Sequence, residues 1–305
     1  MAASAWAALA LMICVACRGV WASGGGASGS QVAENGINWE DAAALQRQLL
    51  IADGRDAPCE MTRRFPYMAS LRNANGTHAC GAVLVDSLWL VTAAHCVDPQ
   101  ARNTVGRTPV AVIGACQLED AENDDEAEVV QVETSIMHPM YTGDLLNGYD
   151  VALLKLSEAS EKSFPVLPEK DDDTLSSENL VVLGWGQQRD GTMADFLQMA
   201  DEVDIIPPVL CTSSDSWGSF IDPDQMICAM GFQGQDVCTG DGGGPLVSAF
   251  APEGVIEDGV PVVDIVLGVV SFAEADKACG EQKLPTVFAR LSGVREWIVS
   301  TMATR

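Results

Sequence analysis

Short runs of β-branched and apolar residues, separated by clusters of Gly, Pro, Asn and Asp, recur from Phe65 to the end of this 305-residue chain. Many short strands at such spacing predict an all-β sandwich or barrel. One helix is expected to close the chain at Val294–Met302, where Trp297 and Ile298 supply packing. The expected strands are Tyr67–Leu71, Ala82–Val85, Trp89–Thr92, Val110–Ile113, Val129–Val132, Val151–Leu156, Leu180–Leu183, Pro245–Val247, Val262–Val270 and Thr286–Arg290.

The first 50 residues differ from the rest of the chain. The apolar run Trp6–Cys17 is too short for a bilayer span, which needs about 20 residues. Val20–Ala22 fits a signal-peptidase site, so residues 1–22 are expected to be a cleaved secretory signal and the protein to be secreted. No Lys or Arg precedes the apolar run, which leaves an uncleaved anchor or a disordered leader open. Residues 23–50 are expected to be a pro-segment or linker.

The cysteine count agrees with export. Two of the ten cysteines fall in the expected signal, and the other eight are an even number without CxxC spacing. This pattern predicts disulfides and argues against a zinc site. Asn75 begins the chain's only N-x-S/T sequon, which is usable if the chain passes through a glycosylating compartment.

The net charge of −26 sets limits on partners. Such a surface repels nucleic acid and anionic membranes, so neither is an expected partner, and no stable membrane insertion is expected after signal cleavage. Solubility is the simplest reason for the charge, with selection of basic partners as an alternative. Two acidic stretches, residues 119–128 and 169–173, are interpreted as solvated loops.

Three separated segments carry residues suited to catalysis. Leu90–Cys96 places His95 after a buried-looking strand, and Gly148–Leu156 places Asp150 at the mouth of another. Cys238–Leu246 contains a glycine run whose amides can approach a ligand closely. A chymotrypsin-type site is built in the chain order histidine, acid, nucleophile. Here the histidine and the acid come in that order, and the glycine loop follows where the nucleophile would be.

These segments read TAAHC, DVALLKL and GDGGGPL, and they resemble the three signature motifs of the trypsin and chymotrypsin family of peptidases. The similarity extends over residues 51–302, which we treat as one peptidase domain with two barrel halves. The resemblance implies two six-stranded antiparallel β-barrels with a C-terminal helix. It also implies that a protein or peptide binds in the cleft between the barrels. Lesser matches are Phe65–Tyr67, Gly184–Gly186, the segment from Cys211 to Cys228, and Trp297-Ile298.

The resemblance assigns a role to each matched residue. His95 corresponds to the general base and Asp150 to the acid that orients it. The amides of Gly240 and Gly242 correspond to an oxyanion hole, and Asp241 to the acid that receives the new N-terminus on activation.

The resemblance also implies three disulfides: Cys80–Cys96, Cys211–Cys228 and Cys238–Cys279. Cys59 and Cys116 remain and are then paired by elimination, as a bridge that is not standard in the family.

The chain departs from the family at the nucleophile. The family motif is GDSGGPL, and Gly242 stands where the serine would be. Neither Ser248 nor Thr239 is placed to replace it. Loss of the serine in subtilisin lowers kcat by about 10⁶, so we expect little or no peptidase activity here. A one-base error in the gene sequence is the alternative explanation.

The expected activation site also departs from the family pattern. The best match to the family's new N-terminus is Ile51–Gly54, but Leu50 precedes it and a trypsin-like activator would not cut there. Without that cut no free amine reaches Asp241.

The specificity pocket is also altered. Asp236 occupies the position that selects Lys or Arg in trypsins. Thr286 replaces a glycine in the pocket wall and is expected to narrow it, and Phe272-Ala273 replaces the usual Trp-Gly pair.

These features favour a secreted, non-catalytic protease homologue that binds proteins or acts as a cofactor in proteolysis. An active serine endopeptidase is the alternative if Gly242 is an error, and a mostly structural secreted protein is a third. No cofactor is expected, although carboxylates in the 119–128 loop suit calcium, an alternative to a solvated loop.

Overall fold

The computed structural model describes residues 54–59, 63–119, 124, 126–169, 179–232, 235–274 and 277–305. The expected signal peptide, the 23–50 segment and Ile51 lie outside these residues, as does part of the acidic 119–128 run. The description below concerns the described residues within the compact unit Gln48–Arg305.

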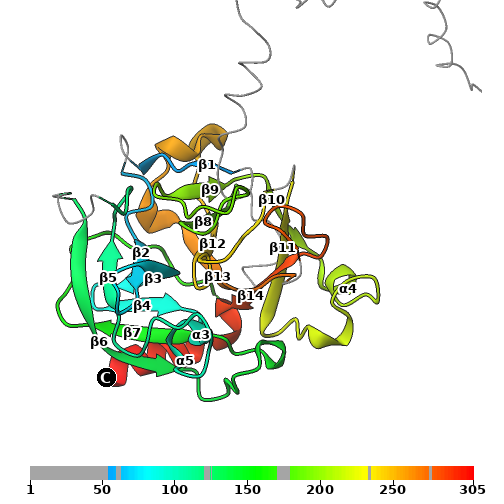
Figure 1. Cartoon of the computed structure of the whole chain (residues 1–305), viewed down its shortest axis with the longest axis horizontal. Coiled ribbons are helices and arrows are strands. Elements are labelled where there is room, and N and C mark those ends of the chain that lie inside the picture. Colours follow the sequence, from blue (N-terminus) through cyan, green and yellow to red (C-terminus); the bar gives the residue numbers. More distant parts are fainter. Residues whose placement is uncertain are drawn as a thin grey trace, which may run out of the picture. The chain divides into compact units, whose positions relative to one another are not determined.

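The first half of this unit is a closed six-stranded antiparallel barrel, with strand order β2-β3-β4-β7-β6-β5 (Figure 1). Its inward-facing residues are almost all Val, Leu, Ile and Ala, which suits the pleated, half-buried surface of a strand. The strands are β2 (Met68–Arg72), β3 (His78–Asp86), β4 (Trp89–Thr92), β5 (Val110–Ile113), β6 (Glu128–Met137) and β7 (Ala152–Leu156).

The second half is an eight-stranded antiparallel sheet that curls into a half-barrel, in the order β1-β9-β8-β12-β13-β14-β11-β10. The short strand β1 extends one edge by pairing with β9. Its strands are β1 (Arg55–Asp56), β8 (Leu180–Gly184), β9 (Gln198–Ala200), β10 (Val203–Ile206), β11 (Met226–Gly231), β12 (Pro245–Ser248), β13 (Ile265–Phe272) and β14 (Thr286–Arg290).

The helices are short except for the last. α5 packs Leu291, Val294 and Ile298 into the core, and Figure 1 shows it in red below the barrel. The helices are α3 (Ala94–Val97), α4 (Pro208–Cys211) and α5 (Leu291–Thr304), with single 3-10 turns η1 (Leu145–Asn147), η2 (Gly218–Phe220), η3 (Pro252–Gly254), η4 (Ile256–Asp258) and η5 (Pro261–Val263).

The predicted fold class is confirmed: the protein is mostly β, with a closed barrel, a curled half-barrel and a C-terminal helix. Several strand bounds differ from those expected: β3 and β6 are longer, and the expected strand Val262–Val270 starts too early, because residues 262–264 fall in and after η5 and β13 begins only at Ile265. Valines at 262 and 263 are β-formers, but Pro261 and the turn that it starts take them out of the ladder.

Four disulfides cross-link the described part of the chain. They join Cys59 to Cys116, Cys80 to Cys96, Cys211 to Cys228 and Cys238 to Cys279. The first links the segment after β1 to the loop after β5. It therefore holds the start of the described chain against the barrel.

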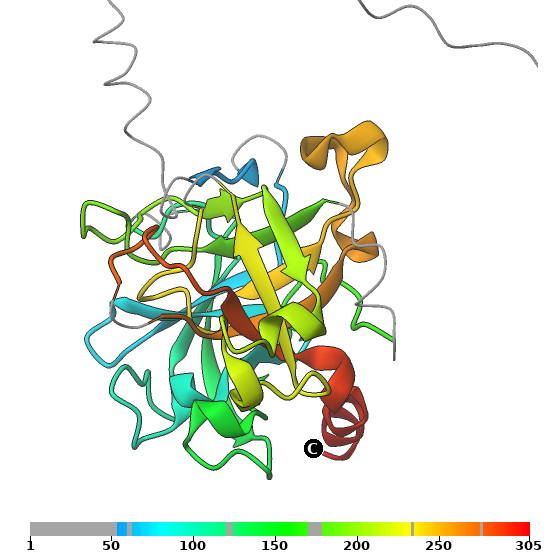
Figure 2. The same ribbon diagram turned by 90° about the vertical axis from the view of Figure 1, so that its right-hand side faces the viewer.

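A buried ion pair anchors the segment between β12 and β13. Arg64 forms two hydrogen bonds to the Asp264 carboxylate, at 2.5 and 2.7 Å, and both side chains are almost fully buried. Tyr67 donates to the same carboxylate at 2.6 Å, and the Arg64 Nε donates to the Ile256 carbonyl at 2.9 Å. Figure 2 shows the anchored segment, in orange, projecting beside the second sheet. Because every charge here is paired, removing one partner leaves a buried charge unmatched.

We therefore expect Asp264→Asn to lower the free energy of unfolding by about 3–5 kcal/mol, the usual cost of breaking a buried pair. Guanidinium unfolding with the disulfides intact measures this. The matched control is Glu257→Gln, which removes a half-exposed partner of Arg55 and should cost less than about 1 kcal/mol. Equal losses in the two variants would contradict the assignment.

Candidate active site

His95 is positioned by β4 and by a disulfide. The fully buried strand β4 ends at Thr92, and His95 follows in the single turn of α3. The neighbouring Cys96 is bonded to Cys80 on β3, so the turn is fixed to two strands at once. The His95 side chain keeps 19% exposure, enough to face a ligand.

Asp150 is brought to His95 by strand pairing. It precedes β7, and β7 pairs with β4 in the register Thr92 to Ala152. The Asp150 Oδ2 lies 2.8 Å from the His95 Nδ1, and its Oδ1 accepts the His95 backbone N–H at 2.9 Å. Ser271 on β13 donates its hydroxyl to Oδ2 at 2.6 Å. A carboxylate with 1% exposure is thus satisfied by three donors.

The surroundings of His95 raise the pKa of its imidazole. Burial is the largest influence and lowers the pKa of the imidazole. The charge of Asp150 and its hydrogen bond act in the other direction and together leave the His95 pKa above its ordinary value of 6.5. With Nδ1 bonded to Asp150, the outward nitrogen of the ring is Nε2.

The loop Gly240–Gly244 packs closely against β3. Gly240 has a φ of +103°, a region that favours glycine. The Gly242 carbonyl accepts the Gly81 N–H at 2.8 Å, and a Cβ on Gly81 would lie 2.8 Å from the Gly244 Cα. Glycine on both strands of this contact is what lets the loop lie beside the barrel.

Gly242 faces His95 directly. A Cβ placed on Gly242 would lie 2.8 Å from the His95 Nε2 and 3.4 Å from its Cε1. The imidazole therefore extends into the space that a side chain at position 242 would need. The N–H groups of Gly240 and Gly242 donate to no backbone or side-chain acceptor in the described part of the chain.

Asp241, between these two glycines, points away from the cleft into the protein. Its carboxylate accepts the N–H groups of Gly186 and Cys238, each at 2.8 Å. Complete burial is the main cause that raises the pKa of Asp241 to about 6. Among the described residues no Lys, Arg or His forms an ion pair with it. Ile51, the expected source of an amine, lies outside them.

His78 is a site residue that sequence reasoning missed. It lies on β3, where its Nδ1 is 2.8 Å from the Ser70 hydroxyl and its Nε2 is 3.0 Å from the Gly240 carbonyl. Burial lowers the pKa of His78 to about 4. A neutral His78 with Nε2 protonated thus holds the Gly240 peptide in place. No motif marks this residue, because its partners are 8 and 162 positions away.

A cavity of about 230 Å³ joins these groups. Its floor and walls are mainly backbone and small or apolar side chains, with one acid and one Lys. The lining residues are Ala79, Cys80, His95, Asn103, Val237, Cys238, Thr239, Gly240, Gly242, Val270, Ser271, Phe272, Ala273, Glu274, Lys277 and Gln282. It therefore contains the expected His95, the two amides and Ala273.

Asp236 and Thr286 do not line this cavity. Both line a separate hollow of about 10 Å³ in the second half. The Thr286 hydroxyl donates to the Asp236 Oδ1 at 2.8 Å, and the Val237 N–H donates to the same oxygen at 2.8 Å. Burial, the largest influence, raises the pKa of Asp236. The Asp236 carboxylate is thus hydrogen-bonded within the protein and does not line the cleft cavity.

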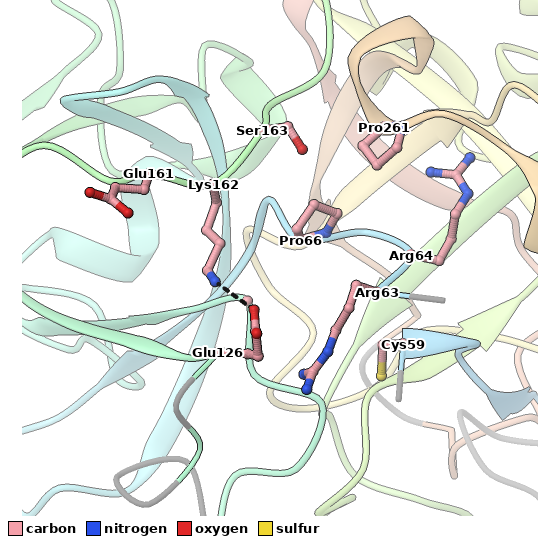
Figure 3. Close-up of a pocket in the computed structure, with 10 residues that line it drawn as sticks. Cys59, Arg63, Arg64, Pro66, Glu126, Glu161, Lys162, Ser163 and Pro261 are labelled. Carbon is pink, nitrogen blue, oxygen red and sulfur yellow. Dashed lines mark ion pairs between the residues drawn. The ribbon is translucent and has the colours of Figure 1, made fainter. Parts of the chain in front are cut away.

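A larger cavity of about 300 Å³ lies elsewhere, where the acidic loop meets two cations (Figure 3). Lys162 pairs with Glu126 at 3.6 Å, as Figure 3 shows, and Arg63 pairs with Asp124 at 3.7 Å. Two carboxylates of the 119–128 run are thus matched by protein cations. The calcium alternative for this loop stays untested, since residues 120–123 and 125 lie outside the description.

Among the described residues one cluster has the spacing of metal ligands: Cys80, His95 and Cys96. The two cysteines form a disulfide, so neither offers a thiolate. These three residues are therefore a disulfide next to a histidine, and they do not form a set of metal ligands. Asn75, the possible glycosylation site, lies exposed in the turn between β2 and β3.

A two-half β structure with a buried Asp–His pair facing a glycine loop defines the chymotrypsin-like class. Residues 55–298 match the family model described as Trypsin, and the chain belongs to this family.

Among known proteins the chain is similar to chymotrypsin-like elastase family member 1. It is 32% identical to the human protein over 252 residues, covering 79% of this chain and 88% of the human one. Identity to the bovine protein is 31%, over 79% of this chain and 86% of that one. No helix in the described part of the chain has the length and apolar character that a membrane crossing requires.

The chain's three histidines permit a direct test of the site's electrostatics. In an NMR titration we expect His95 to titrate above 6.5, and both His78 and His138 below it, because burial lowers the pKa of the latter two. Asp150→Asn removes the charge that holds the His95 pKa up, so that resonance should then titrate lower. A wild-type protein in which no histidine titrates above 6.5 would contradict the assigned Asp150–His95 interaction.

Proposed function

We propose that this protein is a non-catalytic member of the trypsin family that binds a protein or peptide segment in its cleft. The observation that carries the proposal is Gly242, which has no side chain and so no nucleophile. A general base without a nucleophile cannot form a covalent acyl intermediate. What remains is a shaped cleft with hydrogen-bond donors.

The preserved parts of the site support binding. Asp150 keeps its three donors, and the glycine loop keeps its two outward N–H groups. These groups suit a carbonyl oxygen, whether or not the peptide bond is cut. A protein that uses this cleft for recognition, or as a cofactor in proteolysis, needs only these contacts.

We further propose that the cleft accepts an uncharged, modest side chain. Asp236 is held by Thr286 in a separate hollow and does not line the cavity, so a Lys or Arg side chain would not meet the carboxylate that selects these residues in trypsins. Val237, Phe272 and Ala273 line the cavity that remains. The relatives' designation as elastases supports the same choice.

We propose secretion for this protein. Four disulfides suit an oxidising compartment, and the leader at residues 1–22 supports export. In this proposal residues 23–50 form a pro-segment or linker, residues 51–302 the peptidase-like domain, and Asn75 an accessible glycan site. The proposal includes no nucleic-acid partner and no stable membrane insertion after signal cleavage.

An active serine endopeptidase is the second candidate. It is favoured by the intact hydrogen bonds between His95, Asp150 and Ser271, which are the geometry of a working base. It requires that the natural residue at 242 be serine.

A fluorophosphonate probe, which labels activated serines, separates the two candidates. We expect the purified protein, with and without N-terminal processing, to remain unlabelled, because position 242 offers no hydroxyl. An active relative of the same family serves as the positive control. Stoichiometric labelling would overturn the non-catalytic proposal.

Gly242→Ser tests whether the nucleophile is the only missing part. We expect hydrolysis of Arg, Lys and small apolar peptide substrates to stay within about tenfold of background, far short of the 10⁶ that a serine contributes in subtilisin. The new Cβ must displace the His95 Nε2, and Asp241 lacks an amine partner among the described residues.

The control is Gly242→Ser combined with His95→Ala. Strong hydrolysis by the single variant that disappears in the double variant would show that Leu50 and Thr286 are harmless departures.

A further inference from the structure

The two outward N–H groups of the glycine loop are fixed in direction. The Thr239 carbonyl, which shares a peptide plane with the Gly240 N–H, accepts the Gln187 N–H at 2.7 Å. The Asp241 carbonyl, which shares a plane with the Gly242 N–H, accepts the Gly244 N–H at 2.9 Å. In a trans peptide the N–H points opposite to the C=O. Both free donors are therefore held pointing away from Gln187 and Gly244, on residues that line the cavity.

The third donor at this place is His95. Its Nδ1 is bonded to Asp150, and its Nε2 lies 2.8 Å from the Cβ position of Gly242. His95 lines the same cavity as Gly240 and Gly242, and a protonated Nε2 adds a third donor beside position 242. Because position 242 has no side chain, no hydroxyl there accepts that proton, and the one protein contact of Nε2 is the weakly accepting disulfide sulfur of Cys96 at 3.7 Å.

The site offers three hydrogen-bond donors, whereas a ligand carbonyl oxygen accepts from only two of them. A carbonyl oxygen accepts from the two amides and leaves the imidazolium N–H without a partner. A carboxylate offers two oxygens, one for the amides and one for His95, and hydrogen bonds between charged groups are about twice as strong as neutral ones. A carboxylate is thus the better match to the site.

On the basis of the proposed cleft-binding function, we infer that the ligand is the free C-terminal carboxylate of a peptide, seated on the Gly240 and Gly242 amides and on His95. The side chain of its last residue occupies the cavity beside Val237 and Ala273. The site is thus a receptor for peptide ends, such as the new C-terminus that a proteolytic cut leaves.

Long-range charge does not prevent this. The net charge of −26 repels anions, but the Debye length is about 8 Å at physiological salt, so direct contacts decide the affinity. Lys277 also lines the cavity, together with the single acid of the lining, Glu274. The local field is consequently less negative than that of the chain as a whole.

The test compares peptides that differ in one group. Fluorescein-labelled hexapeptides ending in Ala, Val, Leu, Met or Phe are prepared as free acids and as C-terminal amides. Their anisotropy is measured with the full-length secreted protein at pH 6. We expect at least one free acid to bind about tenfold or more tightly than its amide, the ratio expected of a charge-assisted pair.

Two variants test whether the preference for the free acid over the amide arises at His95 and Gly242. His95→Gln keeps a neutral donor but removes the positive charge, and Gly242→Ala fills the space in front of Nε2. Each should reduce the acid-to-amide ratio to about threefold or less. The matched control is His138→Gln, a histidine that stacks on Tyr149 outside the cleft cavity, which should leave the ratio unchanged.

The outcomes are distinct. Equal binding of acid and amide would overturn the carboxylate assignment and leave the proposed function standing. Failure of every peptide to bind would overturn both. Displacement of the peptide by acetate at equal concentration would show a site for small carboxylates and overturn the assignment to peptide ends.

Discussion

The buried carboxylate of Asp150 is the interaction on which the rest of the site depends. A carboxylate with 1% exposure must be fully hydrogen-bonded, and its three donors come from three places: the α3 backbone, the His95 ring and Ser271 of the second half. Asp150 therefore joins the two halves as well as orienting the histidine. Removing it would leave a cleft without a fixed geometry, which is a structural reason for the pair to persist where no nucleophile follows it.

The glycine loop is held by two buried groups whose pH responses oppose each other. The pKa of Asp241 is raised to about 6, so its contribution to stability is full below its unfolded value of 3.8 and is lost as the pH rises through about 6. The pKa of His78 is lowered to about 4, so its contribution is present above 6.5 and is lost as the pH falls towards 4. Because the two pH windows overlap, acidification exchanges one contribution to the free energy of unfolding for the other.

Much of the fold was predictable because local pattern and tertiary structure agree. The strands Trp89–Thr92, Val110–Ile113 and Thr286–Arg290 were predicted with their observed bounds, since each is a β-branched or apolar run between turn residues. Strands β9, β10 and β11 were not predicted, because sequences such as Gln198–Ala200 carry no alternation and are strands only through their neighbours. The half-barrel's extra edge strand β1, two residues long, has no sequence signal at all.

The candidate site divides in the same way. His95, Asp150 and the glycine loop each lie in a contiguous motif, so they can be recognised from the sequence alone. The hydrogen bond from Thr286 to Asp236 joins residues 50 positions apart, and that from His78 to Gly240 joins residues 162 apart, so only the fold reveals them.

These long-range contacts change how the missing serine is understood. Without its hydroxyl, the cleft holds two amide donors that have no acceptor among the described residues, and a His95 Nε2 whose one protein contact is the weakly accepting disulfide sulfur of Cys96, at 3.7 Å. Such a set is costly to leave unpaired in a partly desolvated site, and an anionic ligand satisfies it where a substrate amide does not. In the proposed function, glycine in place of serine at position 242 accounts both for the absence of a covalent step and for the inferred preference for a carboxylate, which an active member of the family, with a hydroxyl in that space, does not need.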